Sequence, residues 1–228
     1  MWKILETGTA QWETADGLWN VDAKGGESGI TLQARDRGVP LAGLHPVGRD
    51  ALPEATENFV RGDTWHVHYS QAQGSYSLDL VFRPIESSAK RLVLELTLSI
   101  HTSLLDSHPT IDLVAEGDGF RVWTPRSEFE WYRATQPSDS GGASCLTAVI
   151  GETAAVSVLL GRRDYPFTLD LSDDRAIQLR LFGDFLEKGV IRKARPWICM
   201  QRDVKDVDES AMIDLWHRLQ ESPLPLTP

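Results

Sequence analysis

Cysteine is scarce in this chain of 228 residues, which contains only Cys145 and Cys199. The two lie far apart in the sequence, and neither belongs to a pair with the spacing of a metal-ligand or redox motif. The chain starts MWKILETGTAQWET, which lacks the charge and apolar pattern of a signal peptide. We therefore expect a cytoplasmic protein, and buried thiols are favoured over a disulfide.

Positive charge and long apolar runs are also in short supply. Lys and Arg number 23 against 33 Asp and Glu, a formal net charge of −10, which argues against nucleic acid or an anionic membrane as a partner. No apolar run approaches the roughly 20 residues that cross a bilayer. The phosphate loop, the dinucleotide fingerprint, the serine elbow and zinc-finger spacing are absent. No cofactor is expected.

The most regular pattern lies between Thr64 and Thr102, where apolar and polar residues alternate along three consecutive segments. Alternation with a period of two is typical of strands with one buried face. Turn-forming residues separate the segments, at Gln71–Gly74 and at Pro84–Lys90. The stretch predicts a three-stranded antiparallel meander with a second face open to water.

The polar face of this meander carries histidines and carboxylates. A four-residue first loop and a second turn centred near Ser87 predict two cross-strand rows. These rows are His66–Asp79–Glu95 and His68–Ser77–Thr97. Directly opposed Cβ atoms lie about 4.5–5.5 Å apart, so that a histidine could pair with a carboxylate and the two could act as acid and base. A register slip of two residues would keep the face and change the partners. The alternative is an ordinary solvated sheet face.

Other candidate residues are spread along the chain. His66 and His68 have the spacing of a metal-binding pair, which resembles the first motif of the cupin family, but the glutamate of that motif is missing and no metal is expected. The charged segment 182–197 contributes Glu187 and Arg192, with a charged edge strand as the alternative interpretation. The candidate catalytic residues are His66, His68, Asp79, Glu95 and Glu187. The candidate ligand-binding residues are His101, Arg192, Trp123 and Trp131.

Strand-like segments recur along most of the chain, and only its end is helical. Met212, Leu215, Trp216 and Leu219 have helical spacing within a helix predicted at about 208–221. Many short strands with one terminal helix predict an all-β fold, a large two-sheet antiparallel sandwich in one domain covering 1–228, with the helix packed on it.

The long meander with its polar face, the segment LEKGVIRKAR and the high β content resemble the galactose mutarotase-like supersandwich over about residues 1–205. The resemblance implies a concave sheet that binds carbohydrate, and catalytic members of that family use histidines and carboxylates. No motif matches residue by residue, so no catalytic role is transferred. Three hypotheses follow: a carbohydrate-binding accessory protein, a sugar mutarotase- or epimerase-like isomerase, and a non-catalytic interaction domain that could form a homodimer.

Overall fold

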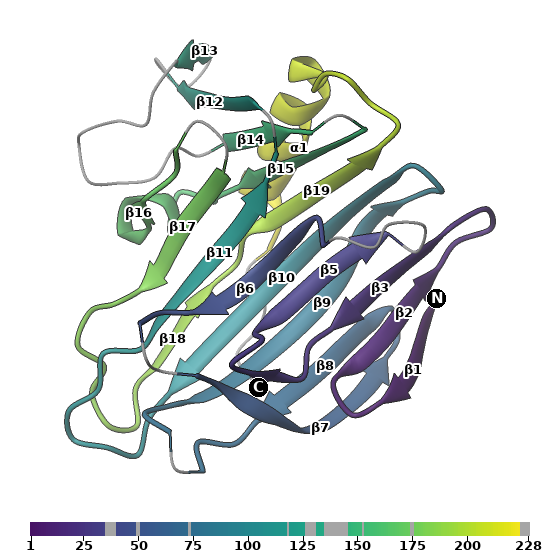
Figure 1. Ribbon diagram of the computed structural model, residues 1–228. Helices are drawn as coiled ribbons and strands as arrows, with labels where there is room; N and C mark the ends of the chain where they lie inside the picture. The colour runs from purple at the N-terminus through teal and green to yellow at the C-terminus, as the bar shows by residue number, and fades with distance from the viewer. Residues whose placement is uncertain are drawn as a thin grey trace.

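The computed structural model describes residues 1–34, 40–48, 51–72, 74–117, 119–125, 131–134, 146–151, 153–173 and 176–223. Within them the chain forms two antiparallel sheets and one α-helix, α1 (Glu209–Glu221). In Figure 1 strands of the smaller sheet lie in front of β8, β9 and β10 of the larger one. The predicted all-β sandwich with a C-terminal helix is confirmed.

The smaller sheet has eight strands in the order β1-β2-β3-β5-β6-β11-β17-β16. Their bounds are β1 (Trp2–Glu6), β2 (Thr9–Glu13), β3 (Leu18–Asp22), β5 (Ile30–Ala34), β6 (Ala42–Pro46), β11 (Thr110–Glu116), β16 (Leu169–Asp170) and β17 (Ala176–Phe182). A short 3-10 helix, η1 (Tyr165–Phe167), precedes β16.

The larger sheet has the order β13-β12-β14-β15-β19-β10-β9-β8-β7-β4, and β18 pairs with β10 beside β19. Their bounds are β4 (Gly25–Gly26), β7 (Leu52–Arg61), β8 (Thr64–Tyr69), β9 (Ser77–Ser87), β10 (Arg91–His101), β12 (Gly119–Pro125), β13 (Trp131–Ala134), β14 (Leu146–Ile150), β15 (Ala154–Leu159), β18 (Ile191–Ala194) and β19 (Trp197–Arg202).

The main core lies between the two sheets and explains the alternating sequence. On β10, every second residue from Leu92 to Ile100 is completely buried in this core. Trp65 and Phe82, directly opposite each other on β8 and β9, stack with ring centroids 4.9 Å apart, and Trp2 of the smaller sheet packs 5.4 Å from Trp65. On β8 and β9 the apolar half of the strand therefore faces the partner sheet, and the other half faces outward.

A second apolar cluster lies on the outer face of the larger sheet, beneath α1. Asp208 caps the helix by accepting a hydrogen bond from the backbone N–H of Ala211 at 3.1 Å. The buried helix residues Met212, Leu215, Trp216 and Leu219 cover Val93, Leu146, Ala148, Ala155, Leu159, Trp197 and Cys199. Cys199 is a buried free thiol whose pKa burial raises to about 11, whereas Cys145 lies outside the described residues. In the described part of the chain, no helix is long and apolar enough to cross a bilayer.

The three predicted strands exist, but the predicted first register is wrong. Asp79 lies opposite His68, not His66. The loop of this hairpin is longer than predicted, because Ser75 does not pair with β8. Its carbonyl oxygen instead accepts hydrogen bonds from the hydroxyls of Thr102 and Ser107, at 2.7 and 2.9 Å. The next strand consequently begins at Ser77 rather than Tyr76.

The second predicted register is also wrong, because Asp79 lies opposite Ser99 and Glu95 lies opposite Arg83. Proline was expected to end the strand at Pro84. Instead β9 has a β-bulge beside the proline: Pro84 pairs with Leu94 and Glu86 with Val93, which leaves Ile85 as the extra residue, and the strand continues to Ser87. Both shifts are by an even number of residues, so the polar residues still share one face.

Candidate functional site

The part of the outer face that α1 does not cover is formed by β7, β8, β9, β10 and β18. We call it the open face. Its members alternate with core residues along these strands and line up in register across them. They are Glu57, Phe59, His66, His68, Asp79, Val81, Thr97, Ser99 and Lys193.

His68 and Asp79 form the closest polar contact of the open face. Nδ1 of His68 lies 2.6 Å from Oδ1 of Asp79, and the two side chains are 41% and 45% exposed. Because this hydrogen bond uses Nδ1, Nε2 is the ring nitrogen that can exchange a proton with a ligand. Glu57 lies opposite His68 on the neighbouring strand and is exposed. His68 therefore has an acidic residue on each neighbouring strand, Glu57 on β7 and Asp79 on β9.

Phe59 gives the open face an aromatic surface. Its ring stacks on the imidazole of His66 with centroids 4.7 Å apart and planes 5° from parallel, and Phe59 remains 48% exposed. Nε2 of His66 is held 2.9 Å from the hydroxyl of Thr64. The pair therefore presents a flat aromatic surface to solvent.

The environment of His66 makes the stability of the protein depend on pH. Burial lowers the pKa of His66, and the positive charge of Arg61 lowers it further, while Asp79 acts in the opposite direction. The unfolded chain therefore binds a proton at this position before the folded protein does as the pH falls. Stability contributed by neutral His66 is present above a pH of about 6.5 and is lost as the pH drops toward the folded-state pKa.

We expect His66→Gln to reduce the loss of stability between about pH 7 and pH 5.5, measured as the midpoint of urea unfolding at each pH. The matched control is His217→Gln on α1, which also removes one imidazole. An unchanged pH slope in the His66→Gln variant would contradict this account of His66.

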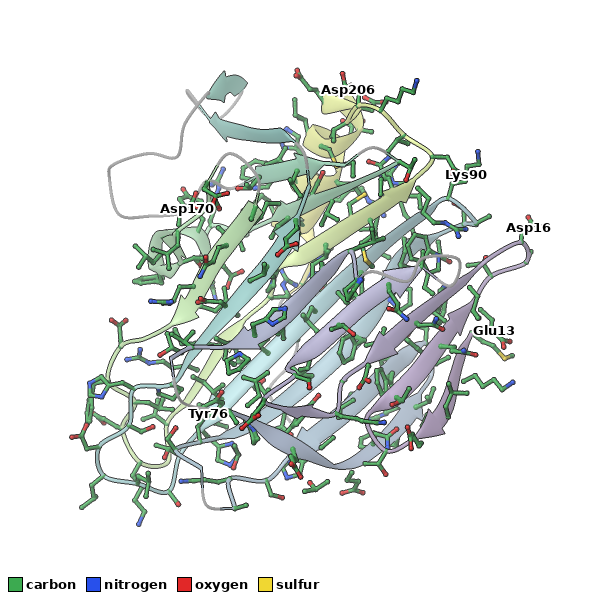
Figure 2. The ribbon with its side chains drawn as sticks, viewed as in Figure 1. Glu13, Asp16, Tyr76, Lys90, Asp170 and Asp206 are labelled. Carbon is green, nitrogen blue, oxygen red and sulfur yellow. The ribbon has the colours of Figure 1, made fainter. Side chains whose placement is uncertain are left out.

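A groove of about 610 Å³ borders the open face at the end nearest His68. Its lining includes Thr56 and Ser70, and the hydroxyl of Thr56 donates to the carbonyl oxygen of His68 at 3.1 Å. Tyr76, labelled in Figure 2, also lines the groove, with Glu54 and Leu104. The groove therefore combines hydroxyl, carboxylate and apolar groups beside the His68–Asp79 pair.

The carboxylate of Glu95 is not available to a ligand, because other side chains of the protein are hydrogen-bonded to it. Its side chain is 5% exposed and accepts two hydrogen bonds from Arg83, at 3.0 and 2.9 Å. The indole N–H of Trp197 donates at 2.9 Å, and Nη1 of Arg195 lies 3.6 Å away. Arg195 in turn donates to the carbonyl oxygens of Pro223 and Leu219. Glu95 thus links the sheet to the C-terminal end of α1, and we assign it a structural role.

Three further candidates lie near the end of β10 and beyond it. His101 is on the same face as Asp79, opposite Ser77 and half-buried. Glu187 is exposed in the turn before β18, where its carbonyl oxygen accepts from Val190. Arg192 points away from the open face, and its guanidinium contacts Asp184 at 3.4 Å and the carbonyl oxygen of Phe185 at 2.8 Å.

Trp123 and Trp131 belong to β12 and β13, at the edge of the larger sheet farthest from β7. Five strands separate β12 from β8 in the sheet order, namely β14, β15, β19, β10 and β9. The side chains of both tryptophans lie outside the described ones. Their strands place them far from His68.

The sequence predicts no metal centre, and the side-chain geometry that bears on this prediction is that of the described residues. Within that part of the chain, no group of three or more His, Cys, Asp or Glu side chains is arranged to hold a metal ion. Nε2 of His66 is directed to Thr64 rather than toward His68. Comparison of the sequence with protein-family models and with curated proteins finds no match.

Sequence reasoning missed Phe59, Glu57 and the groove. The segment 52–61, LPEATENFVR, has three strongly apolar residues, Leu52, Phe59 and Val60, which do not alternate with polar ones, so its strand pattern is weak. A signal was nevertheless present, since Gly62 and Asp63 follow it directly and mark a hairpin turn into β8. That hairpin would have placed Phe59 opposite His66.

Proposed function

We propose that the protein binds a carbohydrate on the open face of the larger sheet. The observation that carries the proposal is the exposed ring of Phe59, held parallel to His66, one strand away from the hydrogen-bonded His68–Asp79 pair. Sugar rings combine apolar C–H faces with hydroxyl groups. They are therefore recognised by a flat aromatic surface next to fixed donors and acceptors. The two-sheet sandwich is consistent with the supersandwich resemblance, which is an analogy of architecture and carries no function by itself.

The proposed ligand is a neutral oligosaccharide rather than a single sugar. His66 and Ser70 are four residues apart on one face of β8 and its continuation, which corresponds to about 14 Å at about 3.4 Å per residue. A ligand that contacts both Phe59 and the groove must span this length. Carboxylates at Glu54, Glu57 and Asp79 along the same path favour an uncharged ligand, because an acidic saccharide would be repelled.

The direct test is a glycan array followed by isothermal titration calorimetry with the best neutral oligosaccharide. We expect binding that weakens when the ligand is shortened to a monosaccharide. We also expect Asp79→Asn to weaken binding while leaving the urea midpoint nearly unchanged, because the His68–Asp79 pair is exposed. Absence of binding to any neutral glycan would overturn the proposal.

A second function, a sugar isomerase of the mutarotase type, is favoured by the orientation of His68. With Nδ1 fixed by Asp79, Nε2 could protonate the ring oxygen of a sugar while Glu57 accepts the proton of the anomeric hydroxyl. The ring opens, the anomeric carbon rotates, and both protons return as the ring closes on the other face. The reaction needs no cofactor, and His68 and Glu57 end in their starting protonation states.

For the isomerase we expect His68→Gln to lower the rate of mutarotation by a factor of about 100 or more, measured by polarimetry on a freshly dissolved anomer. Glu209→Gln, exposed in the first turn of α1, is the control for a removed carboxylate that has no part in the chemistry. Wild-type rates equal to those of buffer alone would remove this second function and leave the binding function intact.

A further inference from the structure

A separate cavity of about 300 Å³ opens at the edge of the sandwich, on a different part of the surface from the groove. It lies where β17 of the smaller sheet approaches β18 of the larger one, next to η1. Volumes of this size are at the lower end of those that hold small ligands. The lining combines charged residues with an apolar wall that includes Phe167, Leu181 and Phe182.

The cavity is bordered by three basic and two acidic residues, in a chain whose net charge is −10. Of the two acidic groups in the lining, Asp184 pairs with Arg192 at 3.4 Å, and Asp164 accepts a hydrogen bond from the backbone N–H of Arg195. Among the described residues, Arg163 has no ion-pair partner. It is exposed at the cavity, so its charge is available to a ligand. Lys193 also borders the cavity, but it lies opposite Ser99 and belongs to the open face.

The remaining lining is apolar and aromatic. Phe167 is 73% exposed, which is unusual for a phenylalanine, and Leu181 is buried at the cavity wall. Phe182 has a φ of 67°, in the left-handed region that a bulky side chain rarely adopts. Such a conformation costs about 1–3 kcal/mol, and residues held in it cluster at active sites, ligand sites and switch regions. A strained aromatic residue and an exposed one thus border the same cavity.

We propose that this cavity binds a small organic anion, with the anionic group at Arg163 and an apolar or aromatic body against Phe167 and Phe182. A guanidinium group binds carboxylates and phosphates alike, so the shared chemistry is an anion on an apolar body. The site goes beyond the proposed carbohydrate function. It uses neither Phe59 nor the His68–Asp79 pair.

The experiment is isothermal titration calorimetry of the full chain with phenylacetate, phenyl phosphate, inorganic phosphate and the neutral 2-phenylethanol. We expect at least one of the two organic anions to bind, and their ratio of affinities identifies the preferred anionic group. The neutral alcohol should bind at least about tenfold more weakly, because it cannot form the charge-assisted hydrogen bonds. Inorganic phosphate, which lacks the apolar body, should bind more weakly as well.

The variant Arg163→Ala should weaken binding of the organic anion by about tenfold. Arg163 is exposed and has no partner among the described residues, so the fold should be unaffected. Arg61→Ala removes an exposed arginine elsewhere and should have no effect. The proposal is overturned if neither organic anion binds, if the neutral alcohol or inorganic phosphate binds equally well, or if Arg163→Ala binds like the wild type.

Discussion

Replacing Glu95 with glutamine should lower the free energy of unfolding by about 3–5 kcal/mol, the cost of removing one partner from a buried ion pair. The carboxylate is almost fully buried and receives hydrogen bonds from Arg83 and Trp197, with Arg195 nearby. A glutamine amide would leave the charge of Arg195, which is 10% exposed, without its counter-ion. Urea unfolding followed by tryptophan fluorescence measures the effect.

The matched control for Glu95→Gln is Asp79→Asn, which removes another carboxylate from the same face of the same sheet. The His68–Asp79 pair is exposed, so its loss should cost at most about 1 kcal/mol. Hydrogen exchange gives a second readout, because Arg195 holds the carbonyl oxygens of Leu219 and Pro223 at the end of α1. Faster exchange in the last turn of the helix is expected only in the Glu95→Gln variant. Equal losses of stability in the two variants would contradict the structural role of Glu95.

Phe59→Ala should weaken oligosaccharide binding at least about tenfold, which corresponds to about 1.4 kcal/mol, within the range expected for the loss of one aromatic contact. Phe59 is 48% exposed, so its removal should affect binding more than folding. The measurement is the dissociation constant of the best glycan from the array, by calorimetry.

Phe167→Ala is the control for Phe59→Ala, since Phe167 is also an exposed phenylalanine but lies at the anion cavity. It should leave oligosaccharide binding unchanged, and Phe59→Ala should leave binding of the organic anion unchanged. This crossed pair separates the two sites, so that one proposal can fail while the other stands. Undiminished oligosaccharide binding by Phe59→Ala would count against the open face as the binding surface.

The alternating pattern of the sequence was sufficient to predict the sandwich, the meander and the members of its polar face, because one buried face imposes a period of two on each strand. It could not fix the register. That depended on the bulge beside Pro84 and on two hydroxyls, of Thr102 and Ser107, that hold Ser75 outside the hairpin. Thr102 and Ser107 lie 27 and 32 residues along the chain from Ser75, so the local sequence of the hairpin does not reveal these contacts.

The candidate site was predictable only in part, for the same reason. His68 and Asp79 were both identified, but their pairing required the true register. Glu95 has the sequence context of an exposed polar residue, and only packing of α1 and of Trp197 around it makes it buried. Phe59 lies on a strand exposed on much of both sides, where the alternation that marks β8 to β10 is weak.

Mapping ligand contacts by NMR tests the central claim most directly. Amide and histidine ring signals of the isotope-labelled protein would be recorded while the best neutral oligosaccharide is added. The account predicts shifts confined to the open face and its groove, with the largest at Phe59, His66, His68 and Asp79. Shifts confined to residues around Arg163 and Phe182, or no shifts with any neutral glycan, would contradict it.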